Sequence, residues 1–166
     1  MNDDADDRVQ IAEADGDPDL EAVRGLLRAY AGEFGPTVRE NLRLQGFEAE
    51  LAGLPGRYAG PSGSLLLARV DGRPAGCVAL RDLGDGVCEM KRLYIDPACR
   101  SIGLGRRLVA AILDRGARLG YRRMVLDSTP EMSRAVALYR SFGFEEAEPY
   151  GDSAHALFFA RSLHDL

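Results

Sequence analysis

The sequence predicts one α/β (α+β) domain with a mixed, mostly antiparallel central sheet of six to seven strands and helices on both faces. Three observations carry this prediction. Short apolar runs are bounded by Gly- and Asp-rich turns, and amphipathic stretches with helical spacing lie among them. Their order is strand, two helices, three strands, helix, strand, helix, strand. The 166 residues, 46% of them hydrophobic, are enough to bury one core.

The first third of the chain is predicted to be mainly helical. Residues 1–7 are acidic and polar, which predicts a disordered lead before a single domain over residues 8–166. Residues 9–12 form a short strand. A helix over residues 17–34 opens with Asp17-Pro18, and a second helical segment over residues 38–54 is interrupted near Gly46.

A three-stranded antiparallel unit follows a Gly- and Pro-rich loop at residues 55–63. The strands are expected at residues 65–70, 75–80 and 87–95. Turn sequences separate them, Asp71-Gly72 in the first connection and an Asp-Gly pair within residues 82–86 in the second.

The last third alternates between helices and strands. A helix is expected from about residue 103 to residue 119, a strand at residues 123–127 and a helix that Pro130 opens. An irregular strand begins at Phe144, and residues 156–160 form the final one. Antiparallel strands followed by strand-helix-strand units indicate the mixed sheet.

Composition excludes several classes of protein. The net charge of −5 argues against nucleic acid as a partner. The three cysteines include no CxxC pair, so no disulfide framework or zinc knuckle is indicated, and two isolated histidines predict no metal. The sequence has no signal-peptide pattern and no apolar run near the ~20 residues of a membrane span. We therefore expect a cytoplasmic protein without a membrane partner.

Residues 93–108 carry the clearest chemical signal, because a strand runs there into a two-glycine loop that opens a helix. Glycines at 103 and 105 allow a ligand close to the backbone, and unpaired amides at a helix start favour a phosphate. Arg106 stands where a Walker loop needs lysine, and Leu108 stands where a dinucleotide loop needs a third glycine. A glycine-tolerant loop with surface arginines is the alternative.

Two motifs then resemble those of the GCN5-related N-acetyltransferase (GNAT) superfamily. Arg100-x-x-Gly103-x-Gly105 is similar to its Arg/Gln-x-x-Gly-x-Gly/Ala loop, and Ala-Leu-Tyr-Arg-Ser-Phe-Gly-Phe at 137–144 is similar to its A-L-Y-x-x-x-G-F segment. The resemblance covers residues 65–144 well and the first 60 residues only in the order of elements. It implies the GNAT fold, with the sheet splayed between the fourth and fifth strands. It also implies acetyl-CoA as the acyl donor, and it is compatible with a homodimer.

The resemblance further implies where the cofactor binds. The pantetheine arm would pair with the backbone of Leu93 and Ile95 in the splay, and the amide near Leu93 would stabilise the oxyanion by ~3 kcal/mol. Many members have asparagine where this chain has Met132, which puts one contact to the arm in doubt. The expected cofactor-binding residues are Leu93, Tyr94, Ile95, Arg100, Ser101, Ile102, Gly103, Leu104, Gly105, Arg106 and Ser133.

Three side chains match catalytic positions of the family. Glu89 is the first candidate for the general base, in phase with Leu93 by the period-two rule, and Asp127 is the second. Tyr139 matches the general acid that protonates the leaving thiolate. The alternatives are a Glu89 that only pairs with Lys91 or Arg73, and a Tyr139 that is a core aromatic.

The sequence says least about the identity of the molecule that accepts the acetyl group. Tyr30, Arg39, Tyr150 and His155 are candidates for its pocket, although Arg39 also fits an exposed helix and His155 a surface position. We expect acetyl transfer to the primary amine of a small molecule or amino acid in a ternary complex, since no cysteine-histidine pair indicates an acyl-enzyme. The alternatives are a non-catalytic CoA-binding module and an acetyltransferase that acts on a protein N-terminus or lysine.

Overall fold

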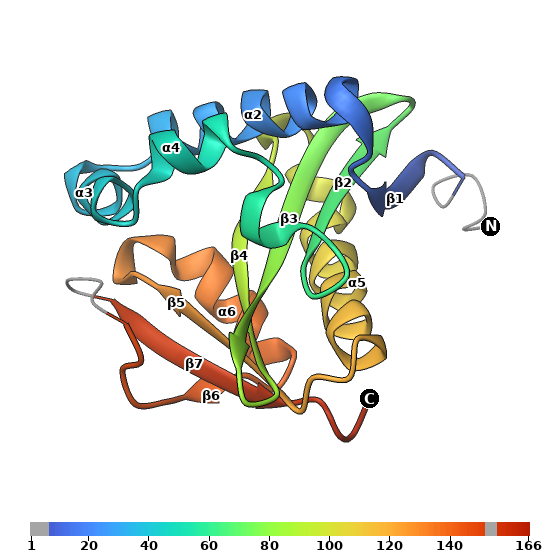
Figure 1. Ribbon diagram of the computed structural model, residues 1–166. Helices are drawn as coiled ribbons and strands as arrows, with labels where there is room; N and C mark the ends of the chain where they lie inside the picture. The colour runs from blue at the N-terminus through green and yellow to red at the C-terminus, as the bar shows by residue number, and fades with distance from the viewer. Residues whose placement is uncertain (1–6, 152–155) are drawn as a thin grey trace.

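The computed structural model describes residues 7–151 and 156–166 of the chain (Figure 1). Most of the predicted lead at residues 1–7, and His155, therefore lie outside the described residues. The described strands form one sheet in the order β1-β2-β3-β4-β5-β7-β6, in which the β4–β5 pair is parallel and the other pairs are antiparallel. The strands are β1 (Val9–Glu13), β2 (Ser64–Val70), β3 (Arg73–Gly84), β4 (Val87–Ile95), β5 (Arg123–Ser128), β6 (Glu145–Glu146) and β7 (Leu157–Ser162).

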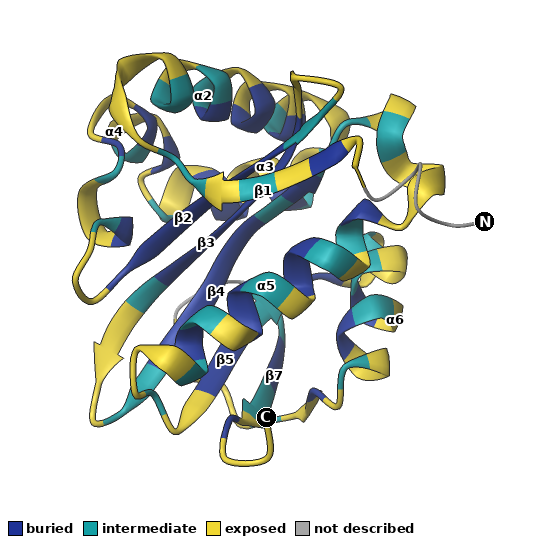
Figure 2. Ribbon diagram, turned by 90° about the vertical axis from the view of Figure 1, so that its right-hand side faces the viewer, coloured by how far each residue is buried: buried dark blue, intermediate teal, exposed yellow. Residues whose placement is uncertain are grey.

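Helices cover both faces of this sheet, which confirms the predicted fold class. The face towards α2, α3 and α4 buries Leu65, Leu67 and Cys77, and the face towards α5 and α6 buries Leu66 and Val78. Figure 2 shows the dark, buried strands between α2 and α5. The helices are α2 (Gly16–Glu33), α3 (Pro36–Leu44), α4 (Phe47–Ala52), α5 (Leu104–Arg118) and α6 (Ser133–Ser141), with short 3₁₀ turns η1 (Gly56–Tyr58), η2 (Pro97–Ile102) and η3 (Pro130–Met132).

The second hairpin is longer than the sequence predicts. β3 continues to Gly84 instead of ending at residue 80, because Arg81 and Asp82 still pair with Glu89 and Cys88 across the ladder. The turn itself lies at Asp85 and Gly86, which both have positive φ, 55° and 77°. Arg81 is thereby placed on the sheet beside Glu89 instead of in a loop.

The sheet opens between β4 and β5, as the resemblance implies. These strands pair only over Val87–Arg123, Cys88–Met124 and Glu89–Val125. Beyond Glu89, the edge of β4 that faces β5 has no ladder partner among the described residues, so this edge can pair with a ligand.

A β-bulge on β4 sets the direction of the side chains at this opening. Arg92 has φ 59°, and the register with β3 jumps from Lys91–Ala79 to Tyr94–Cys77. Leu93 therefore packs towards α5 and α6, whereas Glu89, which alternates with Cys88 and Met90, faces the other side. The prediction that Glu89 lies in phase with Leu93 is wrong, because the extra residue breaks the two-residue period.

A buried ion pair holds the bulge against α4. Arg92 donates to Glu50 through Nε at 2.7 Å and Nη2 at 3.0 Å, and its guanidinium lies 5.1 Å from the ring centroid of Phe47. Burial disfavours the charged carboxylate, yet the Arg92 hydrogen bonds bring the pKa of Glu50 below its usual range. The unusual backbone of Arg92 is thus fixed by its own side chain.

Candidate functional site

Three neighbouring hollows, which share lining residues, surround the opening of the sheet. The α6 groove, of about 580 Å³, lies beside β4 and α6, and the Tyr150 hollow, of about 650 Å³, lies beside β3, β4, β5 and Tyr150. A smaller central passage of about 50 Å³ lies between them. The passage shares Tyr30, Leu93 and Met132 with the α6 groove, and Gln45, Lys91 and Asp127 with the Tyr150 hollow.

The α6 groove contains the strand segment that the sequence predicts for the pantetheine arm. The Ile95 carbonyl accepts a hydrogen bond from Arg100 Nε at 3.1 Å, and Arg100 also pairs with Glu33 at 2.6 Å. The arginine therefore closes one end of the groove by joining η2 to α2. The predicted cofactor residues that line the groove are Leu93, Tyr94, Ile95, Arg100, Gly105 and Ser133.

The start of α5 presents free backbone donors next to this groove. Gly103 has φ 75°, a conformation that favours glycine, and the first helical hydrogen bond runs from the Arg107 amide to the Gly103 carbonyl. The amides of Leu104, Gly105 and Arg106 thus have no acceptor within the helix. Such amides, together with the helix dipole, favour a phosphate.

The remaining predicted cofactor residues surround this helix start. Ser101 and Ile102 are exposed in η2, and the Leu104 side chain is fully buried, so only its backbone can contact a ligand. Arg106 donates to Ser141 Oγ at 3.1 Å and lies 5.0 Å from the Phe142 ring centroid. Its charge stays at the helix start but is held towards α6.

The central passage brings the predicted oxyanion donor, one carboxylate and the predicted acid together. Leu93, Asp127 and Tyr139 all line it. Tyr139 is 6% exposed, and burial, with smaller contributions from Tyr30 and Asp127, raises its pKa. Tyr30 also lies here, between the passage and the α6 groove, where burial raises its pKa to about 12.

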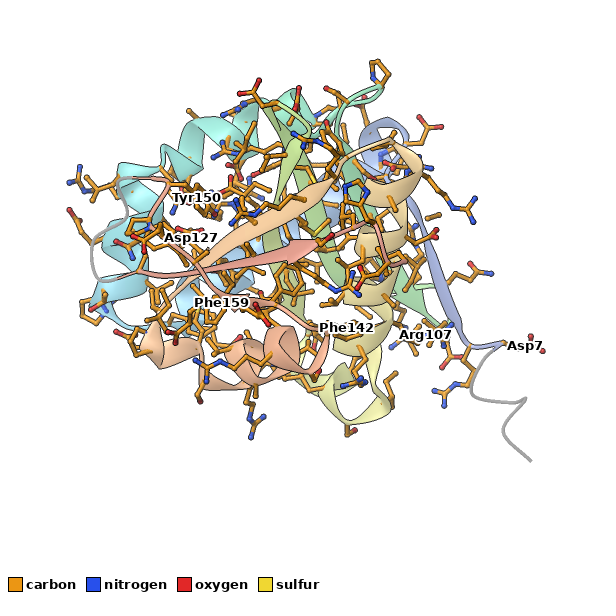
Figure 3. The ribbon with its side chains drawn as sticks, turned by 90° about the horizontal axis from the view of Figure 1, so that it is seen from below. Asp7, Arg107, Asp127, Phe142, Tyr150 and Phe159 are labelled. Atoms are coloured by element: carbon orange, nitrogen blue, oxygen red, sulfur yellow. The ribbon has the colours of Figure 1, made fainter. Side chains whose placement is uncertain are left out.

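Glu89 is held by partners on the Tyr150 hollow. Its Oε1 accepts from Arg81 Nε at 2.6 Å and its Oε2 from the Tyr150 hydroxyl at 2.7 Å. Arg81 is thus its partner, instead of the Lys91 or Arg73 considered from the sequence. Burial and the Glu89 charge raise the pKa of Tyr150, so the phenol stays a donor. Figure 3 shows Tyr150 and Asp127 near one another, far from Arg107.

Lys91 lies at the opening, although the sequence did not single it out as a site residue. It is 7% exposed, lines both the passage and the Tyr150 hollow, and donates to Gln45 Oε1 at 2.9 Å. Its Nζ lies 4.0 Å from Asp127 Oδ1. Burial and the adjacent Arg92 lower its pKa, against the attraction of Glu89 and Asp127. The available signal was that Lys91 is the single lysine in a chain rich in arginine.

Other predictions fall away from the opening. Arg39 is exposed on α3 and is not a lining residue of the groove, the passage or the hollow. Cys77 and Cys88 are fully buried, and burial raises the pKa of both thiols to about 12. The described residues contain no group of three or more His, Cys, Asp or Glu side chains arranged to hold a metal.

The layout is that of a two-substrate transferase. A groove beside the start of α5 and a charged hollow lie on either side of a small cavity that is lined by Lys91, Asp127 and Tyr139. Such an arrangement offers separate places for two ligands.

Comparison with known proteins agrees with this class. Residues 23–144 match the acetyltransferase (GNAT) family. The chain is 42% identical over 134 residues to an uncharacterized N-acetyltransferase of Schizosaccharomyces pombe, covering 80% of each protein. The chain therefore belongs to the acetyltransferase (GNAT) family and is an acetyl-CoA-dependent acetyltransferase.

Solved structures share the fold. An acetyltransferase from Streptococcus agalactiae superposes with a TM-score of 0.77 at 16% identity, covering 93% of this chain and 98% of that one. The structure of yncA from Salmonella typhimurium, which holds its cofactor acetyl-CoA, gives a TM-score of 0.69 at 23% identity and covers 96% of each chain. Within the described part of the chain, no helix is both long and apolar enough to span a membrane.

Proposed function

We propose that the protein transfers the acetyl group of acetyl-CoA to the primary amine of a small molecule or amino acid. The observation that supports the proposal is the central passage, a cavity beside Leu93, Asp127 and Tyr139 that shares lining residues with both the α6 groove and the Tyr150 hollow. The acceptor approaches through the hollow while the thioester lies in the groove. Attack is direct, in a ternary complex.

The cofactor fits the residues of the groove. The unpaired amides at the start of α5 hold the diphosphate, and the unpaired edge of β4 holds the pantetheine arm. The Leu93 amide donates to the thioester oxygen as negative charge develops on it. Bound acetyl-CoA supplies the activated acyl group.

Asp127 is the general base in this proposal. It lines both the passage, beside Leu93 and Tyr139, and the Tyr150 hollow, whereas Glu89 lines the hollow but not the passage. An incoming ammonium therefore meets Asp127 at the opening, and Glu89 keeps the wall of the hollow in place. Tyr139 donates a hydrogen bond to the departing thiolate.

A panel of acceptors, assayed by release of free thiol, tests the proposal. We expect turnover with a subset of small primary amines and amino acids. Asp127→Asn should lower kcat by about 100-fold and leave cofactor affinity unchanged, whereas Glu89→Gln should mainly raise the acceptor KM. Turnover only with a peptide N-terminus or a protein lysine would contradict the small acceptor. Cofactor binding without any transfer would indicate a binding module.

A further inference from the structure

Four cationic side chains line the passage and the Tyr150 hollow. They differ in whether a carboxylate lies within hydrogen-bonding distance of their positive charge. Arg81 has Glu89 at 2.6 Å and Arg92 has Glu50 at 2.7 Å. Arg123 is exposed on the outer part of β5. Lys91 is the remaining cation, and its side chain is 5% exposed.

The ammonium of Lys91 has spare capacity to bind an anion. An ammonium carries three donors, and Gln45 accepts one of them at 2.9 Å. The nearest carboxylate oxygen among the described residues, Asp127 Oδ1, is 4.0 Å from Nζ, beyond hydrogen-bonding distance. A buried charge so weakly compensated gains from a carboxylate that reaches it.

We propose that the acceptor is an α-amino acid whose carboxylate binds Lys91 Nζ while its amine faces Asp127; this inference rests on the proposed function. In an α-amino acid the nitrogen lies about 2.5 Å from the carboxyl carbon. One molecule can therefore place its negative group on Lys91 and its positive group on Asp127, two opposite charges 4.0 Å apart. A simple amine can satisfy only one of them.

Part of the wall of the Tyr150 hollow is apolar and can accept an apolar side chain of this amino acid. Leu44 is 56% exposed and Leu83 37% exposed at the edges of the hollow, and Phe158 lies deeper. With the amine and carboxylate held at the passage, the side chain of the acceptor extends along these apolar groups. Its contact with them removes apolar surface from water.

The reaction balances with the groups already present. The ammonium of the acceptor gives a proton to Asp127, and its nitrogen then forms a bond to the acetyl carbonyl carbon. The carbon-sulfur bond breaks, the bonded nitrogen gives up its second proton, and the thiolate takes up one proton by way of the Tyr139 hydroxyl, so that the proton on Asp127 is the one released to water. The products are an N-acetyl amino acid and coenzyme A, with the carboxylate still on Lys91.

Steady-state kinetics with matched acceptor pairs test the proposal. Each apolar amino acid is compared with its decarboxylated amine, for example phenylalanine with phenethylamine and leucine with isoamylamine. We expect the amino acid to have the higher kcat/KM. Lys91→Met should lower kcat/KM for the amino acid by about 10- to 100-fold, mainly through KM, and should lower that of the amine by a clearly smaller factor.

Two further variants separate binding from folding. Lys91→Arg keeps the positive charge and should retain part of the preference for amino acids. Arg118→Met removes a cation that is exposed on α5 and paired with Asp114, and should change nothing. Thermal melting of Lys91→Met and its KM for acetyl-CoA report whether the fold and the groove are intact.

The outcomes are distinct. Equal turnover of amino acids and amines, with both reduced alike in Lys91→Met, would overturn the carboxylate site while leaving the proposed function standing. Turnover of amines alone would overturn it as well. No turnover with any small acceptor would overturn both.

Discussion

Burial of the Tyr139 side chain limits the acid-base chemistry that its hydroxyl can perform. Its ring packs edge-on against Phe144 at 6.0 Å, and burial raises its pKa above that of a free phenol. The phenol therefore stays protonated over the working pH range but is a weaker acid than the free side chain. Its proposed contribution is a hydrogen bond to the thiolate as the charge forms.

Tyr139→Phe should accordingly lower kcat by about 10- to 100-fold and leave the Kd for acetyl-CoA within about twofold, because the ring still fills the same space. Single-turnover kinetics with calorimetric cofactor titration check this. Tyr121→Phe serves as the matched control, since that hydroxyl donates to the Ser62 carbonyl at 2.6 Å and is not a lining residue of the groove, passage or hollow. An unchanged kcat in Tyr139→Phe would make Tyr139 a core aromatic only.

At the residue scale, the sequence identified candidate residue types but not their contacts. Periodicity placed Glu89 on a strand and Tyr139 on an apolar helix face. The partners of Glu89 are separated from it by 8 and 61 residues. Arg81 became its partner because the β3–β4 hairpin is longer than its turn sequence predicts, and Tyr150 reached it through the fold of the last third of the chain.

The bulge in β4 is the element on which the site geometry depends. It turns Leu93 towards the cofactor side while Glu89 and Lys91 stay on the acceptor side. A two-residue period assumes a regular ladder, so it cannot anticipate the extra residue. The order of strands and helices follows from local patterns, and for that reason it was predictable.

Glu50→Gln should destabilise the protein by about 3 kcal/mol, because it leaves the buried Arg92 guanidinium without its countercharge. It should also lower kcat, since the bulge loses its anchor. Chemical denaturation measures the first effect. Glu48→Gln, on the exposed side of α4, should stay within about 0.5 kcal/mol of the wild type. Equal effects of the two substitutions would contradict the anchoring role.

The start of α5 is the second element that carries function. A Cβ at Gly105 would lie 3.3 Å from Leu138 Cδ2 and 3.4 Å from Ile95 Cδ1, inside the α6 groove. Gly105→Val should therefore raise the Kd for acetyl-CoA by at least about 10-fold, as calorimetry would show. An unchanged Kd would place the cofactor elsewhere.

Gly25→Ala is the matched glycine control. Gly25 is exposed on α2, and a Cβ there meets no atom within 4 Å. The substitution should leave the Kd unchanged and raise the free energy of unfolding by about 1 kcal/mol through helix propensity.

The whole molecule should lose stability in alkali. Burial raises the pKa of Cys77, Cys88 and Tyr30 to about 12, while the same groups ionise near pH 8.5 to 10 when unfolded. A raised folded pKa gives stability that is complete below the unfolded pKa and is lost as pH rises towards the folded value. The window is therefore about pH 9 to 12.

Within its window, each such group should lower the free energy of unfolding by about 1.4 kcal/mol for each unit of rising pH. Urea unfolding as a function of pH measures the total. Cys77→Ala should reduce this pH dependence by the contribution of one group. An unchanged pH dependence in that variant would show that the pKa of the Cys77 thiol does not differ between the folded and unfolded states.

At the scale of the whole molecule, we propose that acetyl-CoA enters from the α6 side of the splayed sheet and that the acceptor enters from the other side. A crystal structure with coenzyme A bound tests it most directly. We predict the diphosphate on the amides at the start of α5, the pantetheine arm along the second half of β4 and the sulfur in the central passage near Leu93. Coenzyme A in the Tyr150 hollow, or an empty α6 groove at saturating cofactor, would contradict it.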